Sequence, residues 1–175
     1  MGTLPPSQGS LFGADSQDEQ GYRGPQVCAL VGITYRQLDY WARTDLLRPS
    51  IEDAKGSGSQ RVYSYRDLVS LKVIKKLLDA GMSLQSVRRA ITYLHENMGE
   101  ELASANLVID GANAVLADNG QLVDLISGGQ GVLNIVAMGA VVNELDATIS
   151  DLSEAKKAKQ AAATPEAAPR RATGS

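Results

Sequence analysis

Charged and aromatic residues are unevenly divided along this 175-residue chain, and the division falls near residue 96. Residues 21–95 hold 12 Lys and Arg residues against 6 acidic ones, whereas residues 96–153 hold 9 acidic residues and no Lys or Arg. Seven of the eight aromatic residues lie between Tyr22 and Tyr93. The formal net charge of -3 therefore conceals a basic block joined to an acidic block. A basic block of this kind is typical of proteins that contact nucleic acid.

The same division predicts four parts of the chain. Residues 1–20, rich in Gly, Ser, Pro and Gln, and residues 154–175, rich in Ala and Lys, are predicted to be a disordered N-terminus and a flexible basic tail, since they have few side chains that could form a core. Between them we expect a basic domain over residues 21–98 and a small acidic domain over residues 99–153. The boundary stands where charge and aromatic content change together.

The residue types exclude several classes of protein. A single cysteine cannot form an intramolecular disulfide, and one cysteine with one histidine is too few for a cysteine-ligated zinc site, an iron–sulfur cluster or a haem. Cys28 is predicted to be a small buried residue rather than a redox sensor, because nothing in the sequence lowers its pKa. No apolar run reaches the ~20 residues that span a membrane. We expect a cytoplasmic protein without a cofactor and without membrane contact.

Two short helices are predicted at the start of the basic block. Gly24-Pro25 begins the first helix, because proline is tolerated in the first turn, and Gly32 ends it. Thr34 and Gln37 have the spacing of a capping box that begins the second helix. The apolar side of the second helix leaves a polar, arginine-bearing side exposed. Two such helices joined by a glycine are typical of a helix-turn-helix.

A β-hairpin, or wing, is predicted next. Residues 50–51 and 61–63 are suited to strands, and the loop between them contains two glycines. Ser64 and Ser83 then begin a third and a fourth helix, each followed by apolar residues at helical spacing. The order of these elements predicts a winged helix-turn-helix DNA-binding domain.

The acidic block has the pattern of a small α/β domain. Its predicted elements are strands at residues 107–110, 113–117 and 132–136 and helices at residues 121–126 and 140–152. Because so small a domain has a thin core, we expect it to supply a dimer contact or a surface for a protein partner. The predicted fold class is therefore α+β: a winged helix-turn-helix domain, mainly α with a β-hairpin wing, and a small α/β C-terminal domain, flanked by disordered tails.

Four fragments of the basic block resemble the MerR family of transcription regulators. They are GITYRQLDYW (residues 32–41), DLLRP (45–49), RVYS (61–64) and AGMSL (80–84), in the family's order and at nearly its spacing. The rest of the chain resembles an actinobacterial subgroup that includes a regulator of the cell-division gene cluster. The resemblance implies a homodimer that binds an inverted repeat in double-stranded DNA, distorts the promoter, and so allows or blocks its use by RNA polymerase in the nucleoid.

The resemblance also implies which residues contact DNA, with the second helix in the major groove and the wing on the backbone or in the minor groove. They are Thr34, Tyr35, Arg36, Asp39, Tyr40 and Arg43 on the helix, and Lys55, Arg61 and Tyr63 on the wing. Asp39 stands where the family usually has arginine. An aspartate there either accepts a hydrogen bond from cytosine N4 or holds Arg36 and Arg43 along the helix. A second departure is that Gly99 and the strands after it interrupt the long dimerisation helix that often follows the winged domain.

Other functions stay open beside promoter control. An architectural or excisionase-like protein would use the same winged module. A ligand sensor or an enzyme would be centred on the acidic domain, for example a metal-stimulated hydrolase that uses Asp110, Asp118 and Asp124. Residues 96–153 contain no His, Lys, Arg, Cys or Tyr, which is a poor set of catalytic groups. The sequence therefore favours a regulator over an enzyme.

Overall fold

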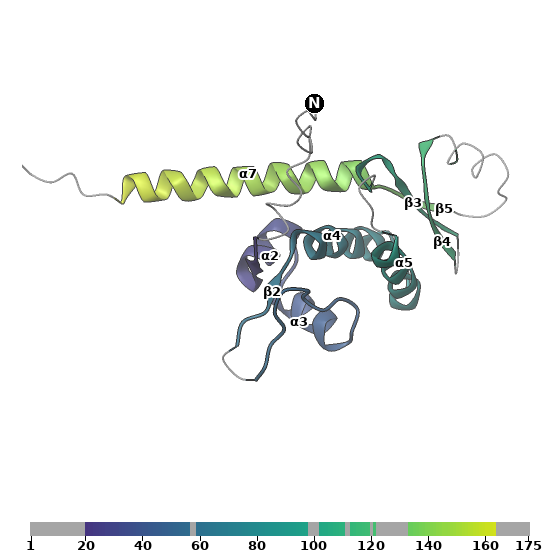
Figure 1. Ribbon diagram of the computed structural model, residues 1–175, viewed down its shortest axis with the longest axis horizontal. Helices are drawn as coiled ribbons and strands as arrows, with labels where there is room; N and C mark the ends of the chain where they lie inside the picture. The colour runs from purple at the N-terminus through teal and green to yellow at the C-terminus, as the bar shows by residue number, and fades with distance from the viewer. Residues whose placement is uncertain are drawn as a thin grey trace, which may run out of the picture.

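The structure, a computed structural model, has the predicted α+β organisation, with helices around a two-stranded pair followed by a three-stranded sheet and a long helix (Figure 1). It describes residues 20–56, 59–97, 102–110, 113–119, 121 and 133–163. The predicted N-terminal tail up to residue 19, and the helix predicted at residues 121–126 apart from Gln121, lie outside the described residues.

The helix-turn-helix consists of α2 (Gly24–Val31) and α3 (Tyr35–Arg43). Gly32 ends α2 with φ at +77°, a left-handed conformation that glycine adopts without a steric cost. Thr34 Oγ1 accepts a hydrogen bond from the backbone N–H of Gln37 (3.2 Å), and the Gln37 side chain accepts one from the backbone N–H of Thr34 (2.9 Å). The predicted capping box is therefore confirmed.

The strands of the wing pair differently from the prediction. Strand β2 (Val62–Tyr63) pairs antiparallel with β1 (Tyr22–Arg23), a segment for which no strand was predicted. The other arm of the hairpin is a single bridge between Glu52 and Val62. Val62 thus lies between two partners, and the wing is attached to the start of α2 as well as to its own loop. Two residues are too few to show the alternation that identifies a strand in a sequence.

Helices α4 (Tyr65–Asp79) and α5 (Leu84–Glu96) complete the N-terminal part. Both begin at the predicted serines: Ser64 Oγ accepts from the backbone N–H of Asp67 (3.2 Å) and Ser83 Oγ from that of Ser86 (3.2 Å). Serine is preferred at this position because its hydroxyl satisfies an N–H group that has no partner inside the helix. Local side-chain chemistry therefore sets where these helices begin.

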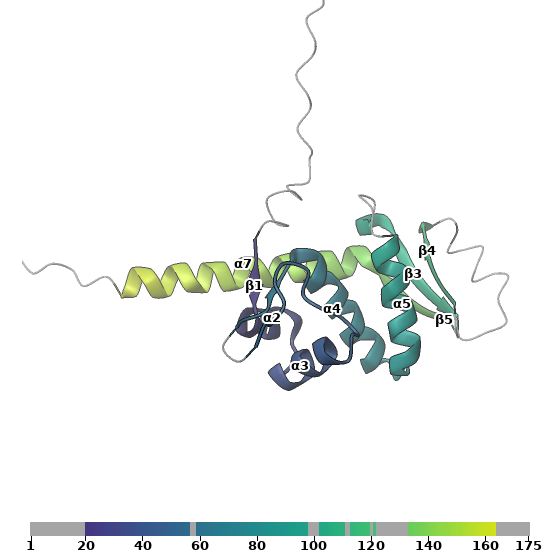
Figure 2. The same cartoon turned by 60° about the horizontal axis from the view of Figure 1, so that its bottom comes forward.

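The C-terminal part contains a three-stranded antiparallel sheet. After a single 3-10 turn, η1 (Leu102–Ser104), β3 (Asn106–Asp110) forms the central strand between β4 (Asn113–Ala117) and β5 (Leu133–Ala137). All three strands were predicted to within a residue of these bounds. The sheet lies beside α5 and the first turns of the last helix (Figures 1 and 2).

The last helix, α7 (Met138–Ala162), is longer than predicted. It continues past residue 152 into the segment predicted as a flexible tail, because the Ala, Lys, Glu and Gln residues there have high helix propensity. Its C-terminal half extends beyond α2 (Figure 1), and every residue from 150 to 163 is exposed. Within the described ranges, no helix combines the length and the apolar character of a membrane span.

One core joins the two parts. Leu107 and Ile109 of β3, with Met138, Val141 and Leu145 of α7, belong to the same buried cluster as the apolar side chains of α2 to α5. Burial of side chains of this size stabilises a fold by roughly 1.5–3 kcal/mol each. The helix α7 is therefore an integral part of the described fold.

Acid–base pairs join α7 to α4 alongside this core. Glu144 contacts Lys72 Nζ (3.4 Å) and Lys76 Nζ (2.9 Å), and the Tyr65 hydroxyl donates to Asp146 Oδ1 (2.7 Å). We call these five residues the α4–α7 seam. The seam brings two basic side chains of the basic block into contact with an acidic side chain of the other block.

Candidate nucleic-acid interface

The exposed side of α3 carries most of the side chains predicted to contact DNA. Leu38, Trp41 and Ala42 are buried, and this orientation turns the remaining side chains of the helix outward. Tyr35 and Tyr40 are 63% and 52% exposed. Tyrosine combines a large apolar ring with a hydroxyl and is enriched at binding surfaces for that reason. The helix therefore presents aromatic and cationic groups together.

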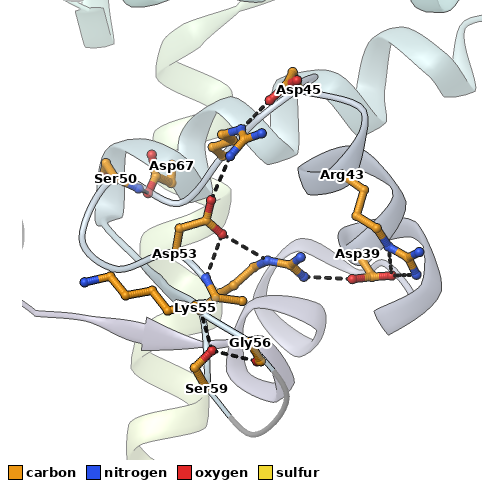
Figure 3. A network of polar contacts seen from close by, with 12 residues as sticks. Asp39, Arg43, Asp45, Ser50, Asp53, Lys55, Gly56, Ser59 and Asp67 are labelled. Atoms are coloured by element: carbon orange, nitrogen blue, oxygen red, sulfur yellow. Dashed lines mark hydrogen bonds and ion pairs between the residues drawn. The ribbon is translucent and has the colours of Figure 1, made fainter.

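Two of the predicted cations are exposed and unpaired. Arg36 on α3 and Lys55 in the wing loop are exposed, and neither forms an ion pair with another residue in the described part of the chain. The Lys55 ammonium points away from the neighbouring arginines (Figure 3). We call the outward side of α3 with this loop the recognition face, defined by Thr34, Tyr35, Arg36, Tyr40, Arg43 and Lys55.

Asp39 connects α3 to the wing. Its Oδ1 accepts a hydrogen bond from Nη1 of Arg61 (2.8 Å), and its Oδ2 accepts from Nε of Arg43 (2.7 Å) and also from Nη2 of Arg43 (Figure 3). The predicted pairing with Arg43 is confirmed, whereas the second partner is Arg61 rather than Arg36. Arg61 lies 22 positions along the chain, so helical spacing could not have identified it.

The same chain of charges continues through the base of the wing. Arg61 Nε also contacts Asp53 Oδ1 (3.3 Å), Asp53 Oδ2 accepts from Nη1 of Arg48 (3.1 Å), and Arg48 Nε pairs with Asp45. Together with the contacts of Asp39, these pairs form one alternating chain of three arginines and three aspartates. We call it the Arg–Asp network, and its members are Arg43, Asp39, Arg61, Asp53, Arg48 and Asp45.

The network keeps its carboxylates charged. Hydrogen bonds from Arg43 and then Arg61 hold the pKa of Asp39 below its ordinary value. The hydrogen bond from Arg48 lowers the pKa of Asp45, and that from the backbone N–H of Ala54 lowers the pKa of Asp53. Hydrogen bonds to a carboxylate favour its ionised form. Three positive and three negative charges are therefore paired here, so part of the positive charge counted in the sequence is neutralised by contacts within the protein.

Two wing residues differ from their predicted placement. The Arg61 side chain is only 18% exposed and is held by Asp39 and Asp53. Tyr63 is wholly buried (0% exposed), because its pairing with β1 turns the ring into the core, and burial raises the pKa of its hydroxyl to about 12. A buried ring cannot contact DNA, so Tyr63 does not belong to the recognition face.

Arg88 holds the end of α3 in place, a contact that the sequence does not reveal. This α5 side chain donates to the carbonyl oxygens of Thr44 (2.8 Å) and Asp45 (2.9 Å), which follow α3 directly. The last carbonyl groups of a helix lack partners inside the helix. Arg88 provides hydrogen-bond donors for carbonyl groups of the turn after α3 and so connects the end of α3 to α5.

The described residues that were considered for other chemistry do not form a reactive or metal-binding site. Cys28 is half-buried on α2, and burial raises the pKa of its thiol, the opposite of what a reactive cysteine needs. Among the described residues, no group of three or more His, Cys, Asp or Glu side chains could hold a metal ion. Asp124 lies outside the described residues.

Comparison with known proteins gives two informative similarities. Residues 22–94 match the family model described as "MerR HTH family regulatory protein". Over 149 residues, the chain is 48% identical to uncharacterized HTH-type transcriptional regulators of Mycobacterium bovis and Mycobacterium tuberculosis, and each match covers 83% of this chain. The same match covers 66% of each relative, so this chain spans about two thirds of the length of these curated relatives.

A solved structure is similar at a much lower level. It is the crystal structure of a MerR-family transcriptional regulator from Bacillus cereus, 15% identical, with a TM-score of 0.36, and the match covers 86% of this chain and 88% of that chain.

Proposed function

The chain belongs, through residues 22–94, to the MerR HTH family of regulatory proteins, and from this premise we propose that it is a sequence-specific regulator that binds double-stranded DNA. The family consists of transcription regulators and not of enzymes. In the proposal, a homodimer binds an inverted-repeat promoter site and modulates transcription by RNA polymerase. Because DNA and polymerase are its partners, the place of action is the nucleoid of the cytoplasm.

The recognition face is the observation that carries this proposal. A capped helix with its apolar side buried presents Arg36, Tyr40 and Arg43 outward, and Lys55 is exposed on the wing loop. The major groove of B-DNA is wide enough to admit such a helix. Arg36 is free of ion pairs among the described residues, so binding to a base edge or a phosphate would break no contact inside the protein.

Binding should depend strongly on salt, because cations that neutralise phosphates release counterions. The test is the affinity of the full chain for genomic duplex fragments from 50 to 200 mM salt. We expect the affinity to fall steeply over this range. No binding to any duplex in dilute buffer would contradict the proposed function.

In this proposal, the two predicted domains have different functions. The segment before the boundary at residues 98–99 supplies DNA readout, and the segment after it supplies the dimer contact and a surface for a protein partner. The exposed half of α7 supports the dimer: Leu152 is 39% exposed, and a helix without neighbours is marginally stable in water. In the proposal, α7, which follows the sheet, takes the place of the long dimerisation helix that often follows the winged domain.

The dimer is tested by replacing an apolar side chain of α7 with a charged one. We expect Leu152→Glu to weaken self-association by roughly tenfold, since it places a charge in an apolar contact, measured by sedimentation equilibrium. Leu84→Glu is the control, because Leu84 is also exposed (42%) but lies on α5. If both variants associate as the unaltered chain does, α7 is not the dimer contact.

The actinobacterial subgroup that includes a regulator of the cell-division gene cluster is the narrower proposal. The mycobacterial origin of the relatives supports it. Mapping of bound genomic fragments, followed by transcription in vitro with RNA polymerase, tests both the target genes and the direction of regulation. A protein that binds DNA without changing transcription would favour the architectural alternative instead.

A further inference from the structure

The contact between Asp39 and Arg43 uses only one edge of the guanidinium. Both Nε and Nη2 of Arg43 donate to the same Asp39 oxygen, Oδ2. The Arg43 side chain is 73% exposed, and Nη1 forms no contact with the described residues. The far end of the guanidinium, which consists of Nη1 and the outward N–H of Nη2, is therefore held in a defined orientation with its donors free.

The other oxygen of Asp39 is already occupied. Oδ1 accepts from Arg61, and both partners of this contact are partly shielded from water, with side-chain exposures of 18% for Arg61 and 21% for Asp39. An ion pair removed from water is stronger than one on the surface. Asp39 is thus held from two elements, and turning it toward cytosine N4 would break contacts with two arginines.

The free donors of Arg43 match one base edge in particular. An arginine fork that donates to O6 and N7 of guanine is the commonest specific contact in the major groove. A phosphate would accept from the same donors, but Asp39 neutralises the charge that attracts it. The arrangement therefore favours the binding of Arg43 to a guanine edge, which depends on geometry, over its binding to a phosphate, which depends mainly on charge.

We propose that Asp39 is a specificity-determining residue that orients Arg43 to recognise a guanine in each half-site and restrains it from binding phosphates of any sequence. This inference rests on the proposed function, since it requires that α3 enters the major groove. The inference explains why residue 39 is an aspartate, although a basic side chain at this position would raise the affinity for DNA. Asp39 lowers the sequence-independent attraction and so favours discrimination.

The experiment is selection of duplexes from a random library by the full chain and its variants, followed by the salt dependence of affinity for the selected and a scrambled duplex. The unaltered chain is expected to select a site in which each half has one preferred G·C pair. The Asp39→Asn variant should show a weak preference, or none, for a G·C pair at that position. Asp39→Asn should also bind the scrambled duplex more tightly, with a salt slope steeper by about 1, because a freed arginine gains a phosphate contact. The ratio of the two affinities should fall by roughly tenfold.

Two further variants separate charge from geometry. Asp53→Asn removes the same charge from the Arg–Asp network but does not contact Arg43, so it should keep the G·C preference while steepening the salt slope. Arg43→Lys keeps the positive charge at an exposed position, where folding is not at risk, but lacks the fork. It should lose the preference for that G·C pair.

The outcomes distinguish this inference from the proposed function. Equal discrimination by the unaltered chain, Asp39→Asn and Arg43→Lys would overturn the assignment of Asp39 and leave the regulator proposal standing. Loss of the preference in Asp53→Asn as well would also overturn it, because charge alone would then explain the effect. Absence of DNA binding by the unaltered chain would overturn both.

Discussion

The recognition face and the α4–α7 seam both contain cations of the basic block, but these cations have opposite surroundings. At the seam, Lys72 and Lys76 reach Glu144 of the acidic block, and Lys72 is buried there. On the recognition face, Arg36 and Lys55 contact no acid among the described residues. The comparison teaches that the charge of a sequence block is not the charge of a surface, because part of it is neutralised within the fold.

The largest expected effect concerns the core beside the seam. Leu145→Ala should lower the free energy of unfolding by about 2–5 kcal/mol, because the side chain is fully buried in the cluster that also contains the apolar side chains of α2 to α5. Denaturant unfolding measures it. The control is Leu84→Ala, at an exposed position on α5, which should cost less than about 1 kcal/mol. Equal losses in the free energy of unfolding for the two variants would show that α7 is not packed on the core.

The next effect concerns the recognition face. Arg36→Ala should weaken binding to a selected duplex by about 1–3 kcal/mol if the side chain reaches a base edge, without changing the free energy of unfolding. Fluorescence anisotropy measures the affinity. Arg89→Ala, which removes an exposed arginine from α5, is the matched control and should have a smaller effect. If the two variants lose affinity equally, general charge rather than α3 accounts for binding.

The smallest expected effect concerns the ion pairs of Glu144 at the α4–α7 seam. Glu144→Gln should lower the free energy of unfolding at neutral pH by less than about 1 kcal/mol, because Glu144 is half-exposed and exposed pairs contribute little. The hydrogen bond from Lys76 lowers the pKa of Glu144 below its ordinary value of 4.5. The contribution is therefore present above pH 4.5 and is lost as the pH falls through the lowered pKa.

Unfolding of the unaltered chain and of Glu144→Gln at neutral and acid pH measures this. The difference between them should shrink as the pH falls below 4.5. A difference that does not change with pH would mean that Glu144 acts through packing rather than through its charge.

The sequence predicts the helices of the N-terminal part well because their ends depend on neighbours within three or four positions. Thr34 and Gln37 satisfy each other across one turn, as do Ser64 and Asp67, and Ser83 accepts a hydrogen bond from the backbone N–H of Ser86. Such contacts are visible as spacing. The exposed side of α3 follows from the same periodicity, and so does the pairing of Asp39 with Arg43.

Contacts between distant segments were not predictable in this way. The pairing of β1 with β2 buries Tyr63, and the contact of Arg61 with Asp39 removes a predicted cation from the surface. The end of α7 was misplaced for another reason: apolar periodicity fades after Leu152, although alanine and lysine continue to favour a helix. The sequence therefore predicted the exposed side of α3 better than it predicted which of the charged side chains there are paired.

In the proposed function, α3 lies in the major groove of duplex DNA, and directed cleavage tests this placement. Because the chain has one cysteine, Cys28→Ser with Tyr40→Cys provides a single attachment point for an iron chelate on α3. Cys28→Ser with Ser150→Cys provides a second exposed attachment point, on α7. We predict localised cleavage of a selected duplex from position 40 and none from position 150. Equal cleavage from both positions, or none from position 40 while the duplex is bound, would contradict the account.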